Sequence, residues 1–192
     1  MRIQRLLILI LALSLPLSAL AEEQCPLIVN LGSSESPDLR TVAQVVSPEG
    51  YAPLEDASPT GSEPEYYLVP NDAESPVRFL YYTTGCGDSR ALAEAARENY
   101  ALFYDEFDSG EIAEITLSGR ACLCLAYTCA YPGRDGATPV YEQSAICYFP
   151  AGENAFVACI LSLSFDSPDD YLSEAAFAES LEQMASAVQW ME

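Results

Sequence analysis

Histidine and lysine are absent from this chain of 192 residues, and their absence excludes several kinds of catalytic site. Without histidine, the chain cannot form a Ser-His or Cys-His nucleophile pair, an imidazole metal ligand or a histidine pH switch. Without lysine, it cannot form a Schiff base or supply the lysine of a phosphate-binding P-loop. We therefore predict no catalytic residue, no cofactor and no metal ligand.

Positive charge is also scarce, because eight arginines stand against 29 acidic residues and give a formal net charge of −21. A charge of this sign repels nucleic acid, which is bound mainly by lysine and arginine, and it repels anionic lipid surfaces. High solubility outside the cell explains the acidity most simply. We expect no nucleic-acid partner. We expect the protein to bind another protein or a small-molecule ligand, whose identity the sequence does not indicate.

The first 21 residues have the three parts of an export signal. Arg2 and Arg5 come first, an apolar run follows at 6–15, and Ala-Leu-Ala occupies positions 19–21. The run is shorter than the roughly 20 apolar residues of a spanning helix, and no later run is long enough to span a bilayer. We predict a signal peptide at 1–21, cleaved after Ala21, and a secreted or extracytoplasmic protein. Cleavage leaves six arginines and 29 acidic residues, a formal charge of −23.

Residues 22–64 are rich in proline, serine and acidic side chains, so they are expected to be an extended or partly disordered lead-in, with one strand at Thr41–Val46. Residues 65–192 are expected to form a single domain. Its predicted elements, in chain order, are strands at Glu65–Val69 and Val77–Thr83, a helix at 89–107, strands at Glu111–Leu117, Arg120–Tyr131, Val140–Phe149 and Phe156–Phe165, and a helix that starts at Ser167.

Short turns between successive strands make the sheet antiparallel, and helices before and after the strands can cover it. The predicted fold class is α+β, with an antiparallel sheet of about five to six strands flanked by helices. One apolar stripe on each helix is expected to face the sheet. The stripes comprise Leu92, Ala96, Asn99, Tyr100, Phe103 and Phe107 on the first helix, and Phe177, Leu181, Met184, Val188 and Met191 on the last, with a break near Ser173.

The layout of residues 65–190 resembles the PsbP-like superfamily, which includes the Ran-binding Mog proteins. The resemblance is carried by a helix of about five turns before a four-strand run, the Gly119-Arg120 turn, the Pro-Gly and Ala-Gly turns, and the step Phe165-Asp166-Ser167-Pro168-Asp169 into a last helix. The aromatic residue common near the first strand of such proteins is matched here by Tyr51 at best, since the single tryptophan is Trp190. The resemblance implies a central antiparallel sheet between helices and a binding or accessory role without chemistry of its own.

Seven cysteines lie beyond the predicted signal: Cys25, Cys86, Cys122, Cys124, Cys129, Cys147 and Cys159. In an exported protein this usage indicates disulfides, and an odd number leaves at least one thiol unpaired or bonded to another molecule. The turn at 132–136 predicts that Cys124 faces Cys147, and the turn at 150–154 predicts that Cys147 faces Cys159. Cys122 would share their face. The candidate disulfide cluster is therefore Cys122, Cys124, Cys147 and Cys159, whereas Cys129 would point to the opposite face.

Three interpretations of the cysteines stay open. Structural disulfides, with the other thiols buried as small apolar groups, are the simplest. A second is thiol chemistry through Cys86, a candidate reactive thiol at a helix N-terminus, with a resolving partner in the cluster. A third is a thiolate metal site built from Cys122, Cys124 and Cys129, although their spacing is not that of a zinc knuckle.

The leading functional hypothesis is an exported, non-catalytic binding or accessory domain. The alternative is an exported thiol/disulfide-active protein that uses Cys86 and the strand cluster. A calcium-dependent module is a third possibility, since Asp105, Glu106, Asp108 and Glu111 supply oxygen ligands. They do not match a calcium-loop pattern, and a solvated helix end and turn is the favoured explanation of them.

Overall fold

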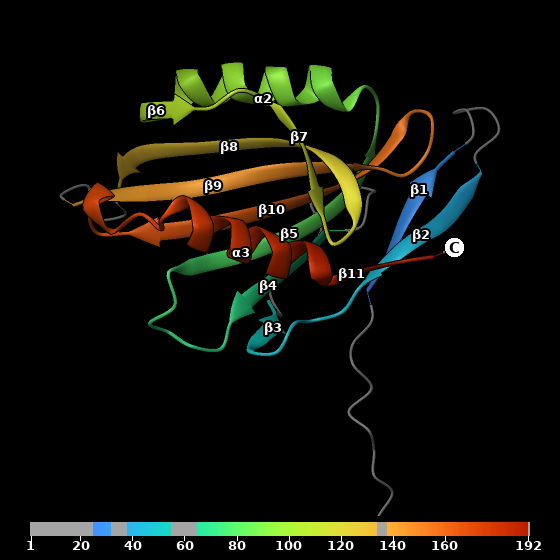
Figure 1. Ribbon diagram of the computed structural model, residues 1–192, viewed down its shortest axis with the longest axis horizontal. Helices are drawn as coiled ribbons and strands as arrows, with labels where there is room; N and C mark the ends of the chain where they lie inside the picture. The colour runs from blue at the N-terminus through green and yellow to red at the C-terminus, as the bar shows by residue number, and fades with distance from the viewer. Residues whose placement is uncertain (1–24, 32–37, 55–64, 134–137, 192) are drawn as a thin grey trace, which may run out of the picture.

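A computed structural model describes residues 25–31, 38–54, 65–133 and 138–191. The predicted signal peptide lies outside these residues. Two antiparallel sheets and two helices make up the described chain (Figure 1). The α+β class is confirmed, but the main sheet has eight strands rather than five or six, and a second sheet of three strands accompanies it.

The main sheet runs in the order β3-β4-β5-β10-β9-β8-β6, and β7 also pairs with β8. Its strands are β3 (Tyr51–Pro53), β4 (Glu65–Pro70), β5 (Val77–Cys86), β6 (Asp105–Ser109), β7 (Ala113–Leu117), β8 (Arg120–Pro132), β9 (Pro139–Pro150) and β10 (Ala155–Phe165). The turn between β7 and β8 is tight, because Ser118 and Gly119 both have positive φ, at 48° and 75°, as a two-residue hairpin turn requires.

Strands β8, β9 and β10 bury side chains on both faces. On β9, Ala145, Cys147 and Phe149 belong to one apolar cluster, whereas Ile146 and Tyr148 belong to the other. This alternation is expected of central strands whose two faces are both covered. Helix α2 covers one face, and α3 together with the second sheet covers the other.

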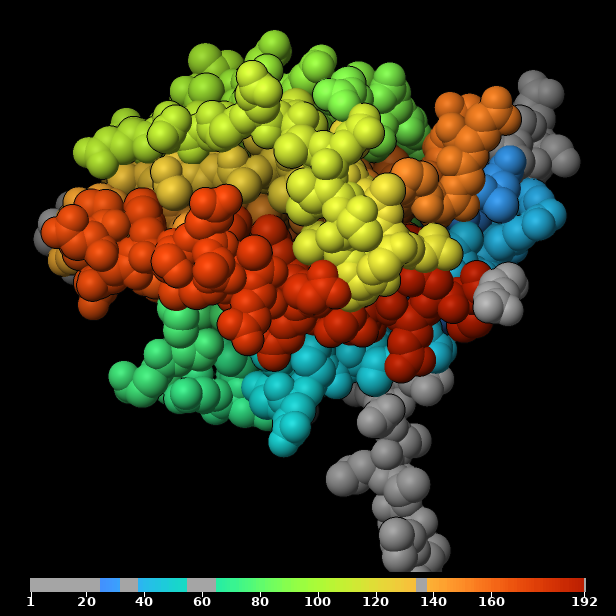
Figure 2. Space-filling model, viewed as in Figure 1, coloured from blue at the N-terminus to red at the C-terminus, as the bar shows by residue number. Residues whose placement is uncertain are grey.

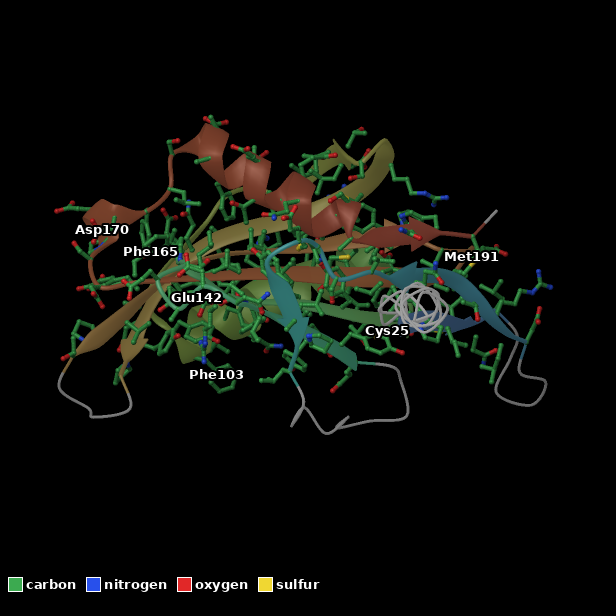
Figure 3. The ribbon with its side chains drawn as sticks, turned by 90° about the horizontal axis from the view of Figure 1, so that it is seen from below. Cys25, Phe103, Glu142, Phe165, Asp170 and Met191 are labelled. Carbon is green, nitrogen blue, oxygen red and sulfur yellow. The ribbon has the colours of Figure 1, made fainter. Side chains whose placement is uncertain are left out.

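Helix α2 (Ser89–Phe103) begins after Asp88, whose carboxylate accepts hydrogen bonds from the backbone N–H groups of Arg90 and Ala91 at 2.9 and 3.3 Å. It ends four residues earlier than predicted, because the chain turns at Tyr104 into β6. Phe107 still reaches the core beneath α2, but from a strand. Phe103, expected on the buried stripe, is 80% exposed and projects outward in Figure 3.

The sequence predicted a single C-terminal helix with a break. The structure instead has three separate elements in this region. Ser167 caps a short 3-10 turn, η1 (Pro168–Asp170), and Ser173 then caps α3 (Glu174–Ser186). The break near Ser173 is therefore present. Val188, predicted to lie on the helix, instead begins β11 (Val188–Trp190). Figure 2 shows α3 (orange-red) across the front of the molecule, with β7 (yellow) reaching it.

The second sheet joins the two ends of the described chain. Its order is β1 (Cys25–Asn30), β2 (Leu39–Val45) and β11, so residues near the N-terminus pair with residues near the C-terminus. The sequence predicted β2 to within two residues but missed β1 and β3. Both missed strands contain proline and lie at sheet edges, where an absent N–H group is tolerated. Leu27 and Val45 belong to the main core cluster, so this part of the lead-in is packed.

Candidate functional site

A pocket of 530 Å³ lies between α2 and the main sheet. Its floor comes from β5, β9 and β10, and one wall comes from the first three turns of α2. The lining residues are Thr83, Thr84, Gly85, Cys86, Leu92, Ala95, Ala96, Asn99, Tyr100, Ile146, Tyr148, Phe156, Ala158 and Ile160. Its volume is within the range of about 300–1,000 Å³ that is typical of small-molecule sites.

The pocket exists because α2 covers only part of its face of the sheet. Ala93 of α2 is buried against Leu125 of β8 and Ile146 of β9, so the helix lies over those two strands. The sheet continues through β10 to β5, beyond the helix. Small side chains help to leave the resulting space open, since Ala95 and Ala96 contribute to the helical wall and Ala158 lies on the floor.

Gly85 has a specific steric role at this floor. A Cβ atom at position 85 would lie 2.5 Å from the ring of Phe156, a distance that real contacts do not reach. Because Gly85 lacks this atom, the Phe156 ring lies against β5. The ring also makes an edge contact with Tyr148, with their centroids 5.3 Å apart. Glycine at position 85 therefore fixes the aromatic part of the pocket.

Among the described residues that line the pocket, none carries a carboxylate or a guanidinium side chain. This is notable in a chain with 29 acidic residues. Burial raises the pKa of Tyr148 to about 12 and also raises that of Tyr100, so both hydroxyls are neutral at physiological pH. The Thr84 hydroxyl donates to the carbonyl oxygen of Ile28 on β1 at 2.7 Å, so it is directed toward the second sheet and not into the pocket. The pocket is thus uncharged and mainly apolar, with a few other hydroxyl and amide groups in its lining.

A second group of interest, missed by the sequence analysis, lies on the same face of the sheet and surrounds Glu142. Glu142 is only 6% exposed, and one carboxylate oxygen accepts a hydrogen bond from the Ser144 hydroxyl at 2.5 Å. Arg78 lies 3.8 Å from the other carboxylate oxygen and donates a hydrogen bond to the Tyr131 hydroxyl at 2.7 Å. Figure 3 shows Glu142 within the body of the molecule.

The tyrosine hydroxyls and the cysteine thiol near Glu142 have raised pKa values. Burial is the larger cause, and the negative charge of Glu142 is the second. Tyr131 and Cys129 are raised to about 12, and Tyr127 is raised further. The period-two pattern of β9 could have found Glu142, because it shares its face with Ile146 and Tyr148. Glu142 is not among the residues that line the pocket, so we assign it no part in ligand contact.

The predicted cysteine cluster lies on the opposite face of the sheet, within the main core. Cys124 pairs with Cys147, and Cys147 pairs with Cys159, in the register expected from the two turns. Cys122 lies in the same apolar cluster. In the structure these four residues are thiols. Cys129 lies on the other face, so Cys122, Cys124 and Cys129 cannot form the thiolate site considered from the sequence.

Cys86 is exposed at the end of β5, and its thiol contacts the carbonyl oxygen of Asn30 at 3.6 Å. It pairs with Ala155, whereas Cys159 pairs with Tyr82, four residues away along each strand. Four residues of strand span about 13 Å, far beyond disulfide reach. The structure therefore does not bring Cys86 together with the cluster cysteines.

The acidic residues considered for calcium do not converge. Asp105, Glu106 and Asp108 are exposed on β6, and Glu111 follows in the next connection. Across the described ranges, no group of three or more cysteine or carboxylate side chains is arranged to hold a metal ion. No helix in the described part of the chain has the length and apolar content needed to cross a bilayer.

No protein family description matches the chain, and no curated protein matches it. Two solved structures resemble it over most of their lengths. A protein of unknown function from Pseudomonas aeruginosa, PA94, is 15% identical with a TM-score of 0.38, and the match covers 81% of this chain and 94% of that one. LpqN from Mycobacterium tuberculosis, described as involved in cell envelope biogenesis, is 16% identical with a TM-score of 0.43, and the match covers 88% of this chain and 92% of that one.

Proposed function

We propose that this protein is an exported, non-catalytic binding domain whose pocket beneath α2 holds a small, neutral, largely apolar molecule. The observation that carries the proposal is the uncharged lining of a 530 Å³ pocket in a strongly acidic chain. Export is supported by the pattern of the first 21 residues, and it stays a prediction. The PsbP-like layout also stays a prediction, and it agrees with a binding role.

The chemistry of the lining defines the class of ligand. Aromatic rings at Tyr100, Tyr148 and Phe156 offer faces and edges for an aliphatic or aromatic body. Asn99 is exposed and can offer its amide to one polar group at the opening. An anionic ligand would meet no cationic side chain among the described lining residues, and the net charge of −23 left after the predicted cleavage would repel it.

Thiol/disulfide activity through Cys86 remains the alternative prediction. Cys86 is exposed, so its thiol is available to reagents. The distance of about 13 Å from Cys159 along the strands argues against the cluster as its resolving partner. We therefore favour the binding role.

Binding of the neutral fluorescent probe N-phenylnaphthylamine tests this proposal. The wild-type protein should bind the probe with increased fluorescence. Ala95→Trp should weaken binding by about tenfold or more, because the exposed Ala95 lines the pocket and a larger side chain can occupy it without disturbing the core. Ala101→Trp, an exposed position of α2 outside the lining, is the matched control and should bind like the wild type.

A further variant separates the pocket from the apolar end of α2. Leu102 and Phe103 are 82% and 80% exposed and could attract an apolar probe. Phe103→Ser should leave probe binding unchanged. If Phe103→Ser loses the probe while Ala95→Trp retains it, the probe binds at the helix end and the pocket proposal is wrong.

A further inference from the structure

The cysteine cluster lies on three adjacent strands at the centre of the sheet. Cys124 of β8 and Cys159 of β10 are both direct partners of Cys147 on β9. Direct partners in antiparallel strands have Cα atoms about 4.5 or 5.5 Å apart. Both separations are within the range of about 4.4–6.8 Å that a disulfide spans. The backbone therefore permits Cys147 to bond to either neighbour.

The side chains distinguish these two neighbours. The Sγ atom of Cys147 lies 3.5 Å from the Sγ atom of Cys124 and makes a hydrogen bond with it. Contacts with Cys122 and Cys124, followed by burial, raise the pKa of the Cys147 thiol well above its ordinary value. Cys159 is not among the groups that act on Cys147. The Cys147 thiol is thus directed toward β8 and away from β10.

Cys122 also contacts the Cys147 thiol, and the hydrogen bond from Cys147 lowers the pKa of Cys122. Cys122 nevertheless lies two residues from Cys124 on β8, diagonal to Cys147 rather than opposite it. Diagonal neighbours have Cα atoms about 7–8 Å apart, too far for a disulfide unless the backbone moves. Cys122 is therefore a neighbour of the reacting pair and not part of it.

We infer that Cys124 and Cys147 form a disulfide between β8 and β9, while Cys122 and Cys159 remain thiols. The oxidant is a donor disulfide, such as oxidised glutathione. One sulfur–sulfur bond forms as the two protein thiols lose two protons and two electrons. The donor disulfide takes up those electrons and protons, its own bond breaks, and two donor thiols are released. Compartments outside the cytoplasm maintain such donors, which agrees with the predicted export.

This disulfide would fix the pairing of the two longest strands of the sheet. A slip of one residue between β8 and β9 would turn every side chain to the wrong face, and a covalent link at one pair prevents it. The bond lies on the face of α3 and the second sheet, opposite the pocket. The inference consequently stands whether or not the pocket binds a ligand.

Disulfide mapping by mass spectrometry tests the inference on the full chain. The reduced protein is refolded with reduced and oxidised glutathione, its free thiols are alkylated, and it is digested. Trypsin alone is insufficient, because no cleavage site lies between Arg120 and Arg134, so Cys122 and Cys124 stay on one peptide. Chymotrypsin cleaves after leucine and separates them at Leu123. We expect a linked pair of Cys124 and Cys147 peptides, with alkylated Cys122 and Cys159.

Two serine variants provide the matched controls. Cys124→Ser should lose the link to Cys147, whereas Cys159→Ser should keep it at the wild-type yield. A wild-type link between Cys147 and either Cys159 or Cys122 would overturn the inference, as would an alkylated Cys147. The wild-type map decides the matter by itself if a variant fails to fold.

Discussion

Replacing Leu27 with alanine is expected to destabilise the folded protein by about 3 kcal/mol. Leu27 on β1 has no exposed surface and belongs to the main core cluster, beside Val45 of β2 and Val188 of β11. Truncation removes the transfer free energy of the lost methyl and methylene groups and leaves a cavity that the surrounding strands fill only in part. The loss is a large share of the stability of roughly 5–15 kcal/mol that is common for a domain.

Leu39→Ala is the matched control, because Leu39 lies on the neighbouring strand β2 but is 68% exposed. Its cost should stay within about 0.5 kcal/mol. Urea unfolding measures both variants, and a lower midpoint at an unchanged slope reports lost stability. Equal small costs for both leucines would mean that β1 does not contribute to the core in solution, and that residues 25–54 behave as the loose lead-in expected from the sequence.

Raising the pH from about 10 to about 12 should unfold the protein. Burial is the main cause that raises the pKa values of Tyr81, Tyr131 and Tyr148 to about 12, and it raises those of Tyr82 and Tyr127 further. Tyrosines in the unfolded chain ionise near pH 10. Their contribution to stability is therefore fully present below about pH 10 and is lost as the pH rises toward 12.

Tyr148 alone accounts for roughly 2 kcal/mol of this loss after allowance for solvent screening. Because the chain has no lysine, proton release in this range comes from tyrosine and cysteine side chains. Tyrosinate absorbance and circular dichroism should change together. Tyr127→Phe should shift the transition to higher pH. Tyrosines that all ionise near pH 10 while the circular dichroism stays native would contradict the burial described above.

The strand register around the cysteines was predictable because long strands meet at well-marked turns. The Pro-Gly and Ala-Gly turns bound β9 on both sides, so counting outward from them places Cys124, Cys147 and Cys159 in one row. Period-two patterning then separates Cys129 from that row. Local sequence carried all the information that this prediction required.

The end of α2 was not predictable in the same way. Tyr100 and Phe107 lie at helical spacing, and both rings contact the ring of Tyr127. Periodicity alone cannot show that Phe107 reaches this contact from β6, because pairing with β8 provides hydrogen bonds that compete with continuation of the helix. The start of β11 also depends on tertiary structure. Val188 continues the helical spacing of α3 in the sequence, but it pairs with β2 and so lies on a strand.

The pocket could not be derived from the sequence, because it depends on where α2 lies across the sheet. Ala95 and Ala96 are ordinary helix residues in the sequence, and Gly85 resembles a loop glycine. Only the placement of α2 over β8 and β9 turns these small residues into the boundary of a cavity. Glu142 differs, since period-two alternation along β9 could have shown an inward-facing carboxylate there, although the sequence analysis did not use it.

The most direct test of the binding role is native mass spectrometry of the protein purified from the organism that makes it. The account predicts that the wild-type protein and Ala101→Trp carry a bound neutral molecule, which collisional activation releases, and that Ala95→Trp carries none. Absence of a bound molecule from the wild-type protein, or its undiminished presence on a folded Ala95→Trp variant, would contradict the assignment of the pocket as the binding site.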